Sequence, residues 1–270
     1  VAPEFSWSTL LENKNVEIAR LNGIYKGLLD NAGVTHFDGR ARIVDQHQVA
    51  IGDIVVSTEK ILIATGSWPV VPEFPGSKHA VTSNEAFFLE ELPQHCLVVG
   101  GGYIAVEFAG IFHGLGVETT LSYRGPLFLR NFDIDIRKTV RKELEKKNIG
   151  LQFESNATSI EKLSSGRFRV EFAVGNQMET DLVLYATGRE PAVKDIGIEN
   201  VDLELRSDSS IIVDENFRTS VDNIFALGDV IGGMQLTPVA IEEAMCFAST
   251  HFLNIKKTMA YDNVATSVFC

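Results

Sequence analysis

The sequence predicts an α/β fold, and three observations carry this prediction. The apolar run LVVG, residues 97–100, ends in a glycine-rich turn and precedes a helical pattern over residues 103–113. A second β-type run, VETTLSY, follows that helix and completes a β-α-β pattern. Helix-like and strand-like segments alternate along much of the chain, as they do in domains built around a parallel sheet.

The elements before this unit are one helix and three strands. Apolar residues at helical spacing predict an amphipathic helix over residues 8–29, which ends near residues 31–33. Three β-type runs follow at residues 35–45, 48–52 and 53–66, with turn residues between them. The proline-rich connector SWPVVPEFPG then leads into the β-α-β unit.

The elements after it continue the alternation. A helix over residues 133–147 precedes the strand LQFES, a polar hairpin and the apolar run DLVLYATGRE. The stretch 211–230 predicts strands that end at Gly228 and Asp229, and ATSVF, residues 265–269, is strand-like. Between them a helix follows QLTPVA, with Pro238 in its first turn, where the missing N–H costs nothing.

Composition excludes several classes of protein. The 270 residues are 45% hydrophobic and 22% charged, which predicts a folded globular protein with room for two domains. A net charge of −12, spread along the chain, disfavours nucleic acid and anionic membranes as partners. No apolar run reaches the roughly 18 residues of a membrane span, and the N-terminus lacks a signal-peptide pattern. We therefore expect a cytoplasmic protein.

Three cysteines are too far apart in the sequence to indicate a disulfide framework or a metal site. Cys96, Cys246 and Cys270 form no CxxC or other close pair. Cys96 and Cys246 are predicted to pack in the core, because a free cysteine behaves as a small hydrophobic residue.

Gly100, Gly102 and Ala105 fit a dinucleotide-binding fingerprint with alanine in the third place. The first glycine allows the tight turn, the second lets the backbone approach a pyrophosphate, and the small third residue lets the helix pack on the strand. The phosphates of the ligand are then bound at the positive end of the helix dipole. The pattern predicts a Rossmann-like nucleotide site.

The residues after the second strand indicate which nucleotide is bound. An NAD site usually has an acidic residue there for the ribose hydroxyls, whereas arginine accommodates a 2′-phosphate. This chain has Arg124 at that point and Arg130 six residues later. Two guanidinium groups can hold a phosphate dianion by paired bonds. The alternative is that both are solvated surface charges, but their place after the fingerprint favours NADPH.

Taken together, GGGYIAVEFAGIFHGLG, YRGPLFLRNFD, ATGREP, ALGDV and QLTPVA resemble, in this order, the glutathione reductases of the class I pyridine nucleotide-disulfide oxidoreductase family. The resemblance covers essentially all 270 residues. It implies a three-layer FAD/NAD(P)-binding fold in which an NADPH domain is inserted into a partial FAD domain. The implied parts are residues 1–63 (FAD domain, first part), 64–192 (NADPH domain), 193–262 (FAD domain, second part) and 263–270 (start of an interface domain).

The resemblance also implies roles for residues at both cofactors. Tyr103 is the aromatic lid over the flavin and Glu107 supports the site, where the family pairs this glutamate with a lysine. With that lysine missing, we expect Glu107 either to have a raised pKa or to be exposed. The further contacts implied for NADPH are Gly101, Ile104, Gly188, Arg189, Gln235 and Ser267, and those implied for FAD are Ala41, Thr65, Gly66, Asp229 and Thr237.

Several parts of the family pattern are missing from these 270 residues. There is no second GxGxxG turn, no CxxxxC pair and no His-Pro pair, so no catalytic residue of the disulfide chemistry is identified. We therefore expect the chain to be the middle of a longer enzyme, and by itself to bind FAD poorly and to reduce disulfides slowly at most.

The implied activity is transfer of a hydride from NADPH to FAD and on to a disulfide, most simply glutathione disulfide, in redox homeostasis, by a homodimer. Two alternatives stay open: reduction of another disulfide such as trypanothione, or a nucleotide-binding remnant without disulfide chemistry. Dihydrolipoamide dehydrogenase is disfavoured, because the two arginines replace its NAD-selecting acid.

Overall fold

The computed structural model describes residues 5–270, which form two compact units. The first contains the described part of Val1–Gly27 together with Pro69–Gly188 and Thr266–Cys270. The second contains Leu28–Trp68 and Arg189–Ala265. The long helix α1 (Trp7–Asn31) contributes residues to both.

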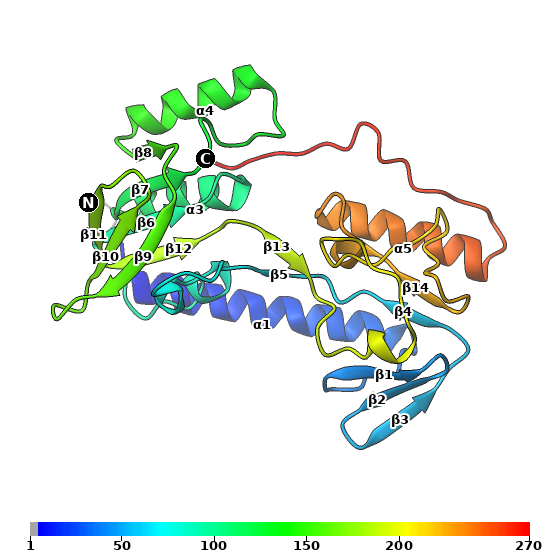
Figure 1. The fold of residues 1–270 in the computed structure, drawn as a ribbon. Coiled ribbons are helices and arrows are strands. Elements are labelled where there is room, and N and C mark those ends of the chain that lie inside the picture. Colours follow the sequence, from blue (N-terminus) through cyan, green and yellow to red (C-terminus); the bar gives the residue numbers. More distant parts are fainter. Residues whose placement is uncertain (1–4) are drawn as a thin grey trace. The chain divides into compact units, whose positions relative to one another are not determined.

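A parallel sheet of four strands, in the order β12-β6-β7-β8, forms the centre of the first unit (Figure 1). β6 (His95–Val99) pairs with β12 (Leu182–Tyr185) and with β7 (Glu118–Tyr123), and β8 (Gly150–Phe153) pairs with β7. Helix α3 (Tyr103–Gly114) connects β6 to β7, and α4 (Ile134–Lys146) connects β7 to β8. The predicted β-α-β pattern and the α/β fold are confirmed.

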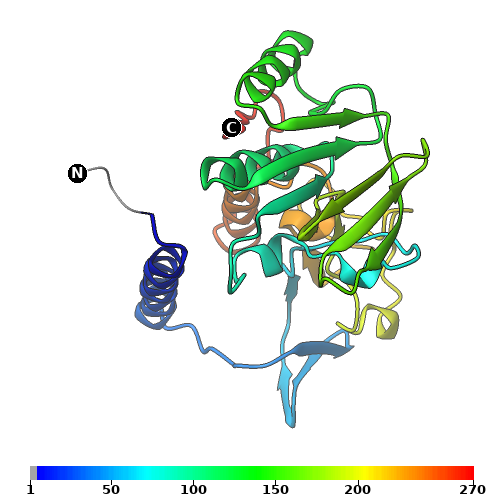
Figure 2. The same cartoon turned by 90° about the vertical axis from the view of Figure 1, so that its left-hand side faces the viewer.

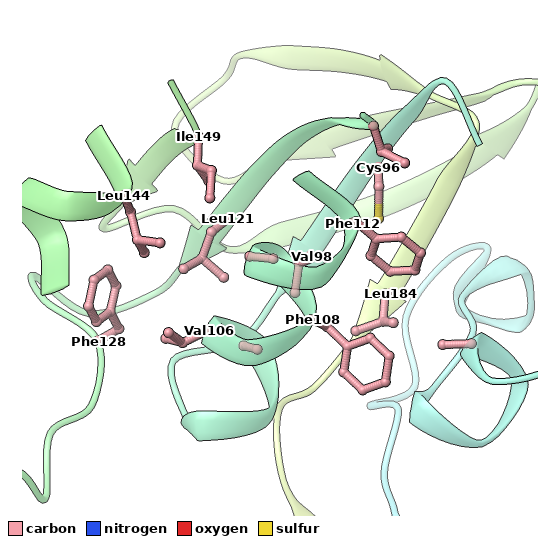
Figure 3. Packing of buried hydrophobic residues seen from close by; sticks show 14 of the residues in the cluster. Cys96, Val98, Val106, Phe108, Phe112, Leu121, Phe128, Leu144, Ile149 and Leu184 are labelled. Atoms are coloured by element: carbon pink, nitrogen blue, oxygen red, sulfur yellow. The ribbon is translucent and has the colours of Figure 1, made fainter. Parts of the chain in front are cut away.

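Alternate residues of β6 pack on opposite faces of this sheet, as the two-residue period of a strand requires. Cys96 and Val98 belong to one buried cluster with Phe108 and Phe112 of α3 (Figure 3). Leu97 belongs to a different cluster, formed with the residues of a second sheet. Both faces of the parallel sheet are therefore covered, which explains why β6 and β12 are apolar at nearly every position.

The second sheet of this unit is antiparallel, in the order β11-β10-β9. Its strands are β9 (Ala157–Lys162), β10 (Phe168–Phe172) and β11 (Gln177–Thr180). Figure 2 shows the three resulting layers: helices α3 and α4, the parallel sheet, and the antiparallel strands. This confirms the three-layer fold. Two short elements precede β6, namely η1 (Ser77–His79) and α2 (Ser83–Ala86).

The second unit has its own core and smaller sheets. β1 (Ala41–Asp45), β2 (Gln48–Ile51) and β3 (Ile54–Ser57) form an antiparallel meander. β4 (Ile61–Ile63) pairs in parallel with β14 (Ile224–Ala226), and Phe225 packs edge-on against Phe247 of α5 (Thr237–Phe252). The remaining elements are β5 (Ser67–Pro69), which pairs with β13 (Arg189–Pro191), and the short helices η2 (Ile198–Asn200) and η3 (Gly228–Ile231).

Four sequence expectations need correction. The strand predicted from residue 35 begins only at Ala41, and residues 265–269 form no strand. Residues 211–223 turn instead of extending, because the carboxylate of Asp214 accepts bonds from the amides of Asn216 and Arg218. The helix over 8–29 is present as α1, but it buries none of its residues.

Candidate functional site

The glycine turn lies between the end of β6 and the start of α3. A Cβ on Gly100 would lie 2.3 Å from the carbonyl oxygen of Ala186, so only glycine fits there. Gly102 is the N-cap of α3, and it has no side chain to bond the first turn. A Cβ on Gly102 would meet nothing within 4 Å. The first glycine is thus required by packing, whereas the second leaves open space before the positive end of a helix.

The ends of two neighbouring strands meet this turn. The Gly100 amide donates to the Ser122 carbonyl at the end of β7 (2.9 Å), and the Ala186 amide donates to the Val99 carbonyl (2.8 Å). Gly188 lies two residues beyond Ala186, and its carbonyl accepts a bond from the Val70 amide (3.1 Å). The turn therefore lies at the carboxyl edge of a parallel sheet, where α/β folds bind ligands.

The two arginines belong to the loop that leaves this same edge after β7. Leu129 lies between them, and its amide donates to the Gly101 carbonyl at 2.7 Å, which ties the loop to the glycine turn. Leu129 is only 2% exposed, whereas both arginines are exposed. Within residues 5–270, neither Arg124 nor Arg130 has a recorded hydrogen bond or ion pair. Their guanidinium groups are available to an anionic ligand.

The second unit holds a compact polar cluster around Ser67. The Ser67 hydroxyl donates to the Asp229 carboxylate at 2.6 Å and accepts from Nε of Arg189 at 2.7 Å. Nη2 of Arg189 also donates to the Ser67 carbonyl at 2.7 Å. Ser67 is buried, with 8% of its surface exposed, so each partner of this cluster depends on the others. Arg189 is therefore engaged with Ser67 rather than free for a ligand.

A buried carboxylate supports the turn that carries Asp229. Glu243 of α5 is 3% exposed and accepts a bond from the Gly228 amide at 2.7 Å and another from the Tyr261 hydroxyl at 2.8 Å. Burial, and then the bond to Glu243, raise the pKa of Tyr261, so its hydroxyl remains protonated and donates. Glu243 thus fixes the backbone next to Asp229 through the amide of Gly228.

The structure divides the predicted site residues between the two units. Glu107 is half-buried, and its carboxylate accepts a bond from the Phe269 amide at 3.1 Å. Thr237 begins α5 as predicted, and it is exposed. The first unit holds Gly100, Gly101, Gly102, Tyr103, Ile104, Ala105, Glu107, Arg124, Arg130, Gly188 and Ser267, and the second holds Ala41, Thr65, Gly66, Arg189, Asp229, Gln235 and Thr237.

The cysteines have the environments that their sequence positions predict. Cys96 is 2% exposed and Cys246 is fully buried, whereas Cys270 is exposed. Burial raises the pKa of Cys96 to about 12, and burial also raises that of Cys246, so neither is a ready thiolate. Across residues 5–270, no three His, Cys, Asp or Glu side chains are grouped to hold a metal ion. None of the helices in this range is both long and apolar enough to span a bilayer.

Sequence reasoning missed three residues of these sites. Ser67 appeared only as part of a connector, although a serine directly after ATG at the end of a strand was an available signal. Glu243 was hidden in an apolar helix, where an acidic residue at a core position points to a backbone partner. Arg137, near the start of α4, donates to the Leu127 and Phe128 carbonyls in the loop that carries the two arginines. Its signal was a cation close to a helix start, where the dipole disfavours positive charge unless another contact holds it.

Known proteins resemble the chain along most of its length. The model of the family described as "Pyridine nucleotide-disulphide oxidoreductase" matches residues 3–244. The chain is 41% identical to a glutathione reductase of Burkholderia cepacia, over 99% of this chain and 60% of that protein. It is 38% identical to a trypanothione reductase of Leishmania donovani, over 98% and 56%.

A solved structure agrees with the fold. The HOCl-induced flavoprotein disulfide reductase RclA from Escherichia coli superposes with a TM-score of 0.88 at 28% identity, over 94% of this chain and 59% of that one. The chain thus spans about three fifths of the length of these relatives. Its glycine turn, its three layers and the match over residues 3–244 lead to one conclusion: the chain belongs to the pyridine nucleotide-disulphide oxidoreductase family.

Proposed function

We propose that this chain is the nucleotide-handling part of an NADPH- and FAD-dependent disulfide reductase whose substrate is glutathione disulfide. The observation that carries the proposal is the glycine turn of α3 beside a loop with two exposed arginines, for which residues 5–270 provide no hydrogen-bond or ion-pair partner. The similarity to a glutathione reductase over 99% of the chain supports the choice of reaction.

The residues of the first unit fit an NADPH molecule. Gly102 leaves the start of α3 open to a pyrophosphate, and the helix dipole favours the negative charge there. Arg124 and Arg130 would bind the 2′-phosphate, which distinguishes NADPH from NADH. When bound, NADPH supplies the hydride and FAD passes the electrons to the disulfide. The role of this unit is to bind and orient the nicotinamide nucleotide.

The residues of the second unit fit part of an FAD molecule. Among residues 5–270, no partner is found for the Oδ1 oxygen of Asp229, and that oxygen can accept a bond from a hydroxyl of the flavin's ribityl chain. The start of α5 has no side-chain cap, so its dipole can stabilise negative charge on a reduced flavin. We propose residues 64–192 as the NADPH domain, 1–63 and 193–262 as parts of the FAD domain, and 263–270 as the start of an interface domain.

None of the three thiols in this chain is proposed to exchange with the substrate. Disulfide exchange requires an accessible thiolate and a second sulfur to resolve the mixed disulfide. Cys96 and Cys246 are buried with raised pKa values and lie in different units. We further propose a homodimer in the cytoplasm, with no nucleic acid partner.

Parallel assays of NADPH oxidation test the substrate. The complete reductase, of which we propose this chain to be a part, is purified and mixed with FAD and NADPH and then with either glutathione disulfide or trypanothione disulfide. We expect a higher kcat/KM for glutathione disulfide, and Cys96→Ser and Cys246→Ser should leave that value within about twofold, because both thiols are buried. A preference for trypanothione disulfide would support the second candidate, which the 38% identity to a trypanothione reductase favours. Binding of NADPH without turnover of either disulfide would indicate a nucleotide-binding protein instead.

A further inference from the structure

The loop between β7 and α4 carries both arginines, one near each end. Arg124 directly follows β7, and Arg130 lies close to the start of α4. Two separate arginine side chains can bind one phosphate together only when the backbone between them has a fixed shape, because each guanidinium donates directional hydrogen bonds. Whatever fixes the shape of residues 124–130 therefore determines how well the pair works.

Part of the fixation comes from burial. Phe128 is completely buried and Leu129 is 2% exposed, and both belong to the core cluster of the first unit. Leu129 has a positive φ of 55°, an unfavourable conformation for leucine, and its amide donates to the Gly101 carbonyl. The loop thus adopts a shape that its own sequence does not favour, so it needs further contacts.

Arg137 of α4 supplies such a contact. Its Nε donates to the Phe128 carbonyl at 2.8 Å, and its Nη2 donates to the Leu127 carbonyl at 2.6 Å. These are two consecutive carbonyls in the stretch between Arg124 and Arg130. The planar guanidinium fork matches such a pair, which the ammonium group of a lysine does not. No carboxylate within residues 5–270 is recorded as a partner of Arg137, so its hydrogen bonds are devoted to the loop.

We propose that Arg137 is a positioning residue that sets the preference for a 2′-phosphorylated nucleotide, by holding the loop in the shape that brings Arg124 and Arg130 onto one phosphate. The inference rests on the proposed role of those two arginines. Arg137 does not itself touch the ligand. Without it the loop is in the binding shape only part of the time, and the apparent dissociation constant rises by the inverse of that fraction. A nucleotide without the 2′-phosphate does not use the two arginines and is not affected.

Calorimetric titration with NADP⁺ and NAD⁺ tests this without any turnover. Arg137→Ala should raise the dissociation constant of NADP⁺ about tenfold and that of NAD⁺ less than twofold. Arg137→Lys keeps the charge but loses the fork, so it should weaken NADP⁺ about threefold. Lys138→Ala removes one positive charge from the same helix without touching the loop, and it should change neither constant by more than about twofold. Hydrogen exchange should show a less protected Leu129 amide in Arg137→Ala.

The outcomes separate the inference from the function on which it rests. If the unmodified protein prefers NADP⁺ but Arg137→Ala changes nothing, or weakens both nucleotides equally, Arg137 does not position the arginines and the inference is overturned. If the unmodified protein binds both nucleotides equally, the proposed 2′-phosphate site is wrong, and the inference about Arg137 is wrong as well. If circular dichroism shows that Arg137→Ala does not fold, Arg137→Lys is used instead. The inference is then judged by whether this variant weakens NADP⁺ more than NAD⁺.

Discussion

The two candidate sites of this protein are built in opposite ways. In the first unit the backbone forms the site: Gly102 leaves the start of a helix open, and two arginines are exposed with no partner in the described part of the chain. In the second unit side chains satisfy one another, because Ser67 links Arg189 to Asp229 by short hydrogen bonds. Exposed charges cost little stability when no ligand is bound, because water solvates them. In a buried cluster, the removal of one side chain leaves its partners without hydrogen bonds and lowers stability. Ligand affinity should therefore be the sensitive quantity in the first unit, and stability in the second.

The largest expected effect is an exception to this comparison, because it is a loss of stability in the first unit, caused by a substitution in the glycine turn. Gly100→Ala should lower the free energy of unfolding by about 3 kcal/mol, because the new Cβ would meet the Ala186 carbonyl, which belongs to the backbone and cannot turn away. Urea denaturation measures this loss. Gly102→Ala is the matched control, since its Cβ has open space and stability should change by less than about 0.5 kcal/mol. It should nevertheless weaken NADP⁺, because the methyl group stands where the pyrophosphate approaches.

The arginine pair gives an effect of similar size, and here affinity alone should change. The double substitution Arg124→Ala, Arg130→Ala should remove on the order of 2 to 4 kcal/mol of the preference for NADPH over NADH, as expected for two charge-assisted contacts. The free energy of unfolding should remain within about 0.5 kcal/mol, since both side chains are exposed. Titrations with both nucleotides, together with urea denaturation, test the two halves of the prediction. Equal affinity for NADPH and NADH in the unmodified chain would contradict it.

In the second unit, Ser67→Ala tests whether stability is the quantity that changes. It removes the acceptor of Arg189 Nε and the donor to Asp229, so partly buried polar groups lose their partners. We expect a loss of about 1–3 kcal/mol in the free energy of unfolding. Ser57→Ala, at an exposed position of β3 in the same unit, is the control and should change stability by less than about 0.5 kcal/mol. If the two serines behave alike, the polar cluster does not stabilise its unit.

The parts that could be predicted from the sequence are those that depend on neighbours along the chain. The apolar runs, the glycine turn and Pro238 at the start of α5 all act locally, and the structure has these elements where they were expected. Ser67 has a local signal in its place after ATG, but its partners could not be identified, because they are 122 and 162 residues away. Arg137 was missed for a different reason: its partners are backbone carbonyls 9 and 10 residues away, and carbonyls leave no mark in a sequence.

The same distinction explains the wrong strand predictions. Residues 211–223 have the apolar content of strands, but the carboxylate of Asp214 bonds two amides and turns the chain. Side chains of this kind compete with a sheet for the backbone, and composition alone does not show which wins. The roles assigned to individual cofactor-binding residues are still predictions, and the substitutions described above are their tests.

The smallest expected effect concerns pH, and it lies in the first unit away from the glycine turn. Asp181 accepts bonds from the His95 amide at 2.8 Å and from Arg167 Nε at 3.0 Å. Burial by itself would raise the pKa of Asp181, but the bonds from His95 and the charge and bond of Arg167 outweigh burial and hold the pKa below its usual value. The unfolded chain therefore takes up this proton at a higher pH than the folded chain does.

This order of proton uptake determines how the stabilisation by Asp181 changes with pH. The stabilisation by ionised Asp181 is fully present above the pKa of an unfolded aspartate, about 3.9, and is lost as the pH falls through the lower folded value. At pH 6, Asp181→Asn should be less stable than the unmodified protein by under about 1 kcal/mol, because the ion pair is partly exposed. The difference should shrink below pH 4, as followed by urea denaturation at a series of pH values. Asp53→Asn, at an exposed turn, controls for the loss of one negative charge. A difference between Asp181→Asn and the unmodified protein that stays constant down to pH 2 would show that these contacts do not favour the ionised carboxylate.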